Sequence, residues 1–291
     1  REGLTIQKRG VTVNTITFQR FFQLYPTLAA MTATAQDSHE EFKQMYNLDI
    51  VVFPPHQKSL RIDHEDLILT TKEEKWHAVI QDINRLHKKG TPVLVGTQSI
   101  NDTKTLSNKL NNLGITYNVL NAENDACEAQ IIADAGKPYS VTISTNMAGR
   151  GTDIKLGGKN QYSYKEAAAC GGLYVIGTNR YESRRIDNQL RGRAARQGDP
   201  GASKFIISLE DDLFIKYRLN ELLSFHFFKK TSKEQMESKE LPCEMDRIQR
   251  IIEGQNYDIK TTLFKYSTLV ETYRKEHLAF RNDVLNSHQA Y

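Results

Sequence analysis

Cysteine is scarce in this sequence. Its 291 residues include three cysteines, Cys127, Cys170 and Cys243. They are too few and too widely spaced for a disulfide framework or for the paired-cysteine pattern of a zinc site. The sequence therefore predicts a reducing, cytoplasmic environment and gives no indication of a metal site.

Long hydrophobic runs are also missing. No apolar stretch approaches the roughly 20 residues that a membrane-spanning helix needs. The first ten residues have no apolar core of the kind found in signal peptides. Any membrane contact is therefore expected to be peripheral. Position 1 is Arg and not Met, which indicates a piece of a longer chain.

The third missing feature is a phosphate-binding loop. The pattern Gly-x-x-x-x-Gly-Lys-Ser/Thr, which holds nucleotide phosphates, does not occur. No strand-terminal Asp-Glu pair suited to Mg²⁺ is evident either, although the acidic run 210–212 follows a predicted strand. We therefore expect that this chain alone does not hydrolyse ATP.

The composition that is present suits one or two soluble globular domains, with 39% hydrophobic and 25% charged residues. The net charge of +4 and pI near 8.8 are mildly basic. This balance permits an anionic partner such as nucleic acid or a membrane surface, but does not require one.

Residues 56–215 alternate between predicted strands and helices. Strands are expected at 92–97, 117–120, 140–145, 173–178 and 204–209. Helices are expected at 71–89, 125–135 and 183–196, and a further helix runs through Leu106, Leu110 and Leu113 and is stopped by Gly114. The helix at 71–89 opens with a Thr-x-x-Glu capping pattern. This alternation is typical of an α/β fold with a parallel sheet covered by helices on both faces. Ligands of such sheets bind beyond the carboxyl ends of the strands, where the loops after Thr145 and Thr178 are expected.

The regions on either side of residues 56–215 do not show this alternation. Residues 1–55 combine β-like runs at 11–17 and 50–53 with a helical stretch at 18–30, and Pro54-Pro55 indicates a linker. A helical pattern begins at Met245, where two rows of residues recur every seven positions. These rows are Ile259, Tyr266, Tyr273 and Phe280, and Leu263, Val270, His277 and Val284. They predict a seam that packs on other helices, within one protein in preference to a homodimeric coiled coil.

The run Gln189-Leu-Arg-Gly-Arg-Ala-Ala-Arg196 carries the clearest chemistry. On a helix, Gln189, Arg193 and Arg196 would share one face. Gly192 inside that helix would permit close approach of a backbone or a phosphate. The planar, always charged guanidinium fits phosphate oxygens in a bidentate way. The spacing favours a phosphate-binding face over a solvated basic surface.

A second chemical segment, Asn-Met-Ala-Gly-Arg-Gly-Thr-Asp at 146–153, follows a predicted strand. Gly149 and Gly151 allow a tight turn that exposes backbone N–H groups to an anion. Arg150 can reach phosphate, and Asp153 can accept from a ribose hydroxyl. The alternative is an ordinary strand-to-helix turn in which Asp153 is a cap.

Together, these two segments resemble the last two motifs of superfamily 2 helicase-type ATPases, and residues 183–201 resemble the SecA family of protein-translocation motors in particular. Shorter runs at 16–25, 92–100, 118–122, 171–178, 208–214 and 251–259 resemble the same family. The resemblance implies a RecA-like parallel sheet flanked by helices and followed by an α-helical scaffold region. It divides the chain into the end of a first nucleotide-binding domain (1–55), a second such domain (56–215) and the scaffold region (216–291).

The resemblance also implies roles for individual residues. Arg196 would be an arginine finger on the γ-phosphoryl group, assisted by Arg193 and Gln189. Thr32 and Thr34 would couple the nucleotide state to domain movement. The expected nucleotide contacts are Asp153, Arg150, Gly151, Gly149 and Gly192.

Cofactors and partners follow from the same resemblance. ATP with Mg²⁺ would bind in the complete protein, whose missing N-terminal half would supply the phosphate-binding and Mg²⁺-binding motifs. The implied partners are a membrane protein-conducting channel, an unfolded preprotein and the anionic inner face of a bacterial cell membrane, with a homodimer left open. Nucleic acid is disfavoured, because no basic stretch interleaved with aromatics is present.

Two alternatives stay open at this point. Gly-Arg-Ala-Ala-Arg also fits DNA-repair helicases of superfamily 2. A regulatory module that binds a partner through the 259–284 seam would not need Arg193 or Arg196. Within the SecA reading, Ala33, Ala194-Ala195 and Ser267-Thr268 replace the usual Gly, Ser-Gly and paired acids, which indicates a diverged, accessory type.

Overall fold

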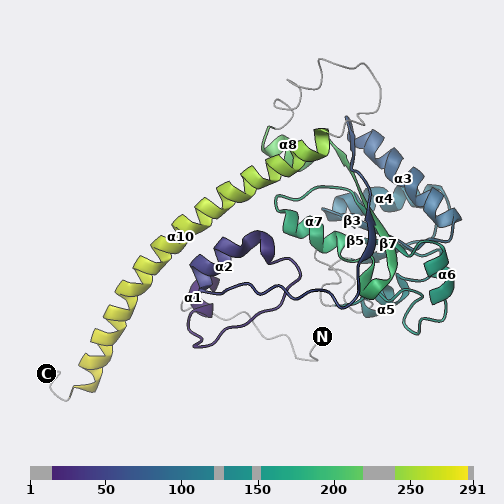
Figure 1. Cartoon of the computed structure of the whole chain (residues 1–291). Coiled ribbons are helices and arrows are strands. Elements are labelled where there is room, and N and C mark those ends of the chain that lie inside the picture. The colour runs from purple at the N-terminus through teal and green to yellow at the C-terminus, as the bar shows by residue number, and fades with distance from the viewer. Residues whose placement is uncertain (1–14, 121–127, 146–151, 219–239, 288–291) are drawn as a thin grey trace. The chain divides into compact units, whose positions relative to one another are not determined.

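The computed structural model describes residues 15–120, 128–145, 152–218 and 240–287 (Figure 1). The chain forms two compact units, one combining Arg1–Phe53 with Arg250–Tyr291 and the other comprising Pro54–Gln249. The chain thus leaves the first unit at Phe53 and returns to it at Arg250. The residues predicted to carry the chemistry near 150 and 190 belong to the Pro54–Gln249 unit.

The Pro54–Gln249 unit is built on a parallel sheet. Its order is β1-β7-β6-β3-β5-β4, with β2 also paired to β7, and these neighbouring strands run parallel to one another. The strands are β1 (Leu60–Asp63), β2 (Leu67–Leu69), β3 (Val93–Thr97), β4 (Asn118–Leu120), β5 (Val141–Thr145), β6 (Leu173–Gly177) and β7 (Pro200–Ser208).

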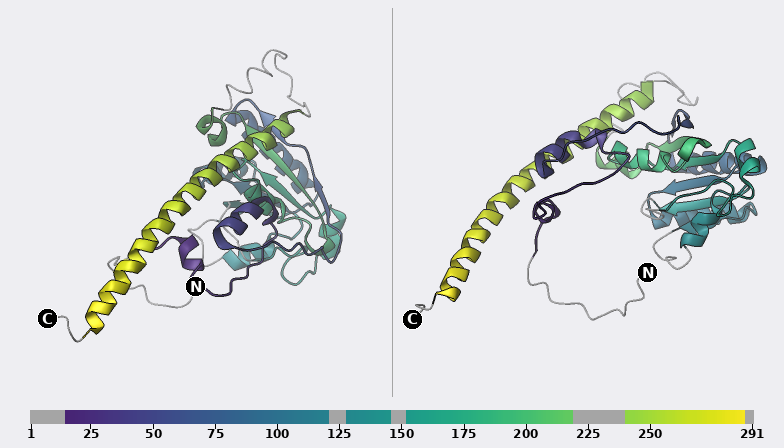
Figure 2. Two further views of the ribbon diagram at one scale, coloured as in Figure 1. Left: turned by 60° about the vertical axis from the view of Figure 1, so that its left-hand side comes forward. Right: turned by 60° about the horizontal axis from the view of Figure 1, so that its bottom comes forward.

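Helices cover both faces of this sheet (Figure 2). They are α3 (Lys72–Lys88), α4 (Ile100–Asn112), α5 (Glu128–Asp134), α6 (Tyr164–Ala169), α7 (Arg184–Arg191) and α8 (Asp212–Lys216). Val93 and Val95 join the core beneath α3 and α4. Because side chains alternate along a strand, Gly96 faces the other side, where Leu190 of α7 lies against it. The predicted fold class, a parallel sheet flanked by helices and followed by a helical region, is confirmed.

Helix α3 forms as its sequence predicts. The Thr71 side chain accepts from the Glu74 backbone N–H at 3.2 Å, and the Glu74 carboxylate accepts from the Thr71 N–H at 3.1 Å. This capping box satisfies two backbone donors that the first turn leaves without helical partners. Trp76, Val79 and Ile83 then point into the core.

A buried ion pair ties α3 to the turn before α8. Lys75 Nζ lies 2.5 Å from Asp211 Oδ1, and the two side chains are 1% and 2% exposed. Asp211 also accepts from the Ser208 backbone N–H at 2.9 Å. Buried charges need such partners because desolvation is costly. The middle residue of the acidic run 210–212 is therefore committed to holding the fold.

The unit of Arg1–Phe53 and Arg250–Tyr291 is largely helical where it is described. It contains α1 (Phe18–Phe22), a 3₁₀ turn at Gln36–Ser38, α2 (His39–Tyr46) and most of α10 (Glu240–Asn286). Lys260 of α10 lies 2.9 Å from Glu41, and Arg20 donates to the Thr268 carbonyl at 3.3 Å. Contacts of this kind hold the two sequence segments together as one unit.

Several predicted elements of this unit are wrong. The helix expected over 18–30 ends at Phe22, since Pro26 cannot donate a helical hydrogen bond and also disfavours a helical residue before it. Residues 50–53 form no strand, and Val51, Val52 and Phe53 are exposed. Of the run 11–17, residues 15–17 form no strand and the others lie outside the described part.

Helix α10 is 47 residues long, and Figure 2 shows it as one unbroken helical ribbon. The predicted helix is thus confirmed, but its predicted seam is not packed within this unit. All eight seam residues are exposed, among them Tyr266 at 66% and Phe280 at 68%. Thr261, Phe264 and Thr268, on another face, are half-buried instead. None of the described helices has the length and apolar character to cross a bilayer.

Candidate functional site

The predicted arginine helix is shorter than its sequence pattern indicates. Helix α7 ends at Arg191, and Gly192 is its C-cap. Ala195 and Gln197 then adopt left-handed backbone angles, with φ of 54° and 52°. The helix expected over 183–196 is therefore wrong in its last turn, because a left-handed residue cannot continue a right-handed helix.

This ending separates the three side chains that were expected on one helical face. Gln189 lies on α7, whereas Arg193 follows the helix and Arg196 opens a separate 3₁₀ turn at Arg196–Gly198. Gly192 likewise lies at the helix end and not inside the helix. A Cβ there would come 3.0 Å from the Asn188 carbonyl oxygen, so glycine fits a tight local turn.

The fold nevertheless brings the two predicted chemical segments together. Arg196 Nη1 lies 2.6 Å from Asp153 Oδ1, across 43 positions of sequence. Arg196 Nε also donates to the Gly192 carbonyl at 3.0 Å, which fixes the guanidinium plane. The side chains of Arg196 and Asp153 are 35% and 41% exposed, so this ion pair is open to solvent.

The segment after Arg196 is anchored next to this pair. Asp199 accepts from the Tyr164 hydroxyl of α6 at 2.9 Å. Gly198 has φ of 85°, and a Cβ on it would come 2.1 Å from the Gln57 side chain. Glycine is therefore favoured at this turn by its backbone angle, whereas the Gln57 side chain is flexible and can move away from a Cβ.

The segment that follows α7, residues 192–196, lies toward the amino ends of the strands and is called the arginine segment below. Gly201 pairs with Leu173, the first residue of β6, so β7 begins beside the beginning of β6. Arg193 and Arg196 lie in the short segment between the end of α7 and that start. Of the two loops expected at the carboxyl edge, the one after Thr178 follows the end of β6 there, whereas residues 146–151, which follow Thr145, lie outside the described part. Helix α7 then carries the chain back, and the Arg196–Asp153 pair lies away from that edge.

Other predicted site residues are not brought to this pair by the described structure. Thr32 and Thr34 belong to the other unit, where their hydroxyls lie 3.3 Å apart. Gly149, Arg150 and Gly151 lie outside the described residues.

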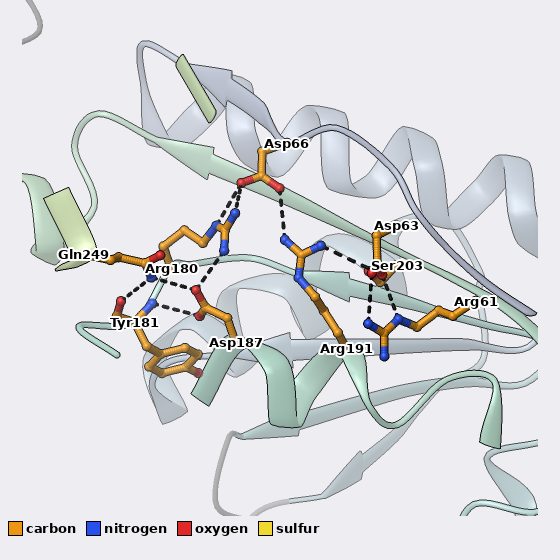
Figure 3. A network of polar contacts seen from close by, with 9 residues as sticks. All are labelled: Arg61, Asp63, Asp66, Arg180, Tyr181, Asp187, Arg191, Ser203 and Gln249. Atoms are coloured by element: carbon orange, nitrogen blue, oxygen red, sulfur yellow. Dashed lines mark hydrogen bonds and ion pairs between the residues drawn. The ribbon is translucent and has the colours of Figure 1, made fainter. Parts of the chain in front are cut away.

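A network of charged side chains, which the sequence did not reveal, holds the beginning of α7 (Figure 3). Arg180 Nη1 donates to Asp187 Oδ2 at 2.9 Å, and Arg180 Nε donates to Asp66 Oδ2 at 2.8 Å. The Tyr181 backbone N–H donates to Asp187 Oδ1 at 3.1 Å. Gln249 of α10 donates to Asp187 Oδ2 at 2.7 Å. Asp187 is 1% exposed, so it is a buried carboxylate with several donors.

The same network holds the end of α7. Arg191, the last helical residue, lies 3.5 Å from Asp66 and 3.8 Å from Asp63. The Arg180 and Arg191 guanidinium groups both lie over the Phe205 ring, at 4.6 and 4.8 Å. Three aspartates thus balance three arginines: Asp63, Asp66 and Asp187, and Arg61, Arg180 and Arg191.

Burial shifts pKa values in this network in different directions: it raises the pKa of the Asp187 carboxyl and lowers that of the Arg191 guanidinium, although both groups have charged partners. Burial alone would raise the pKa of Asp63, but hydrogen bonds from Arg61 and Ser203, with the nearby positive charges, lower that pKa below its usual value. Burial raises the pKa of the Tyr181 phenol, whose hydroxyl donates to the Thr97 carbonyl at 3.3 Å. Helix α7 therefore starts and ends in a charged framework, and the arginine segment follows directly from it.

The donor chemistry at Arg196 fits a phosphate group. A guanidinium that is one-third exposed and fixed by a backbone carbonyl can exchange a carboxylate for phosphate oxygens of the same charge. Over 15–120, 128–145, 152–218 and 240–287, no three His, Cys, Asp or Glu side chains gather as metal ligands.

Comparison with known families agrees with this architecture. The model of the SecA P-loop domain matches residues 58–169 and 160–231, and that of the SecA DEAD-like domain matches residues 1–43. The chain is 45% identical over 289 residues to protein translocase subunit SecA 2 of Clostridioides difficile, covering 98% of this chain and 37% of that protein. It is 46% identical over 290 residues to protein translocase subunit SecA of Elusimicrobium minutum, covering 98% and 34%.

Among solved structures, the DEAD-box protein SrmB of E. coli, bound to regulator of ribonuclease activity A, matches 55% of this chain and 84% of its own. The identity is 18% and the TM-score 0.42, which adds nothing to what the strand pairings show.

The parallel sheet and the matching family models define a domain of the P-loop and DEAD-like type. More particularly, the chain belongs to the SecA family. It spans about a third of the length of the curated relatives it matches.

Proposed function

We propose that this chain is the arginine-finger half of a SecA-type motor, which uses ATP to push preproteins through a membrane channel. The observation that carries the proposal is the 2.6 Å pairing of Arg196 with Asp153, because it joins both family motifs at one exposed place. Residues 1–55, 56–215 and 216–291 would be the end of the first nucleotide-binding domain, the second such domain and the scaffold region.

In this proposal, ATP binds between this chain's sheet domain and the missing N-terminal half, which also holds Mg²⁺. Bound ATP supplies the γ-phosphoryl group that is transferred to water. Arg196 exchanges Asp153 for phosphate oxygens and stabilises the charge that develops there, which an arginine finger does by a factor of about 10³–10⁵ in rate. Arg193 and Gln189 assist, and Asp153, once released, contacts the nucleotide, together with Gly192 and residues 149–151.

The proposal places the complete protein in the cytoplasm, bound peripherally to the inner face of the cell membrane. Its partners are the protein-conducting channel, an unfolded preprotein and anionic lipid. This chain alone is expected to have no ATPase activity, since it lacks the phosphate-binding loop. Thr32 and Thr34 would transmit the nucleotide state to the other domain.

The test compares ATPase rates of the full-length protein under two kinds of stimulation. One reaction contains channel-bearing membranes and an unfolded preprotein, and the other contains single-stranded RNA. We expect stimulation by membranes with preprotein and none by RNA. Stimulation by RNA alone would overturn the translocase proposal and favour a nucleic-acid helicase.

A further inference from the structure

The first turns of helix α10 belong to the Pro54–Gln249 unit, and one side of them is buried in it. Met245, Ile248 and Gln249 are buried there, at 0%, 7% and 0% exposure. Their spacing of three and four residues places them on one side of a helix. Two of the three are apolar, so the polar Gln249 side chain needs a reason to be buried, because an amide without hydrogen-bond partners is costly in a core.

That reason lies in the contacts of its amide nitrogen, since the buried amide oxygen has no hydrogen-bond partner among the described residues. Gln249 Nε2 donates to Asp187 Oδ2 at 2.7 Å and to the Tyr181 carbonyl at 2.7 Å, which uses both of its hydrogens (Figure 3). Asp187 lies in the first turn of α7, and Tyr181 lies in the loop that leads into it. The amide therefore bridges the two segments that set where α7 begins.

The start of α7 determines where the arginine segment lies. The helix has eight residues, and Arg191 at its end is fixed by Asp63 and Asp66. Gly192, whose carbonyl accepts from Arg196, follows immediately. Because such a short helix moves as a rigid body, a shift at Asp187 is passed to the Gly192 carbonyl and so to Arg196.

We propose that Gln249 is a positioning residue, which makes the beginning of the long helix α10 a support for the arginine segment through its hydrogen bonds to Asp187 and Tyr181. This inference rests on the proposed function for its effect on ATP hydrolysis. Its structural part, that Gln249 fixes α7, does not depend on that function.

Hydrogen exchange tests the structural part on the full-length protein without nucleotide. Gln249→Leu removes both hydrogen bonds and keeps a buried, helix-compatible side chain. We expect amides of residues 184–196 to exchange about ten-fold faster, since a hydrogen bond to a charged group is lost. The matched control is Gln255→Leu, an exposed glutamine six residues further along α10, which should leave these amides unchanged. Equal exchange in the Gln249→Leu and unaltered proteins would overturn the inference.

Steady-state kinetics test the functional part. The arginine acts on charge that develops in the transition state, so its misplacement should lower kcat about ten-fold and change KM for ATP less than two-fold. A loss of thermal stability with an unchanged kcat would show that Gln249 is merely structural. Arg196→Ala in the same assay separates the two proposals. If Arg196→Ala leaves kcat unchanged, the proposed function fails; if it lowers kcat and Gln249→Leu does not, only this inference fails.

Exchanging the amide and the carboxylate between positions 249 and 187 distinguishes loss of this contact from misfolding. Gln249→Glu places a second carboxylate against Asp187 and should lower kcat more than Gln249→Leu does. Adding Asp187→Asn restores an amide facing a carboxylate, with donor and acceptor exchanged, and should recover kcat several-fold over Gln249→Glu alone. No recovery by the double variant, with Gln249→Glu still folded, would show that the two side chains do not act through their contact.

Discussion

Helices α7 and α10 differ in how far their side chains are buried. On α7, Asp187 and Leu190 are buried, and charged partners from strand β1 and two loops hold both ends of the helix. On the part of α10 beyond Arg250, large apolar residues such as Leu263 and Tyr266 face solvent, at 63% and 66% exposure. The short helix is therefore held at both ends, while the long helix leaves apolar side chains in solvent. The position of a helix depends on its contacts and not on its length.

The comparison also separates two kinds of buried contact. The α7 framework consists mainly of ion pairs, which are costly to desolvate and specific in geometry. The contact between Leu190 and Gly96 is apolar, and it depends only on how closely the two residues pack. Charged partners fix where α7 starts and ends, and the Leu190–Gly96 contact packs the helix against the sheet. The arginine segment needs both, since it begins where α7 stops.

The largest expected effect is that of removing the finger side chain. Arg196→Ala in the full-length protein should lower kcat for ATP hydrolysis about 10³-fold, because a charge that stabilises the transition state is lost. Steady-state ATPase measurements check this. Arg247→Ala is the control, since that arginine is 73% exposed on α10. An effect below ten-fold would remove Arg196 from the proposed mechanism.

Breaking the framework should instead destabilise the fold. Asp66 is 3% exposed, accepts from Arg180 and lies 3.5 Å from Arg191. Asp66→Ala leaves the buried Arg180 and the half-buried Arg191 guanidinium groups without this partner and should cost about 3–5 kcal/mol of unfolding free energy.

Urea unfolding of the 291-residue chain measures this loss. The control is Asp212→Ala, whose carboxylate is 73% exposed and lies 3.6 Å from Lys72. That change should cost less than about 0.5 kcal/mol. Similar costs for the two variants would mean that the framework adds no more than a surface ion pair does.

Relieving backbone strain beside the site should have a smaller effect of opposite sign. Ala195 has φ of 54°, an angle that is unfavourable for a residue with a Cβ. Ala195→Gly should raise the unfolding free energy by about 0.5–1 kcal/mol, the relief being partly offset by the freedom of glycine in the unfolded chain. The adjacent Ala194→Gly provides the opposite result, a loss of about 1–2 kcal/mol, since Ala194 is buried and has an ordinary backbone angle. If Ala195→Gly were destabilising, the turn would not be strained.

The sequence predicted elements whose signal is local. Strands β3, β5 and β6 are apolar runs, and α3 carries its capping box within four residues, so each was found with small errors at its ends. Strands β1 and β2 were missed, because they are three or four residues long and exist through pairing with β7. Helix α6 was also missed.

The site was predicted in part, for a related reason. Local motifs pointed to Arg196 and Asp153, which the fold brings together. The last turn of the expected helix was wrong, because Ala-Ala-Arg has high helix propensity and only the entry into β7 demands a left-handed residue there. The framework was invisible, since Asp66 and Arg180 are 114 positions apart and form no local pattern.

The smallest expected effect sharpens the contrast between the two helices. Leu263→Ala on α10 should change the unfolding free energy by less than about 0.5 kcal/mol, because the side chain is already in water and alanine is the better helix former. The same substitution at Leu190, which is 8% exposed against Gly96, should cost about 2–5 kcal/mol. Urea unfolding of the two leucine variants of the 291-residue chain compares identical chemistry in the two settings. Equal costs would mean that the α10 seam is covered in solution, and the helices would then differ only in which residues cover them.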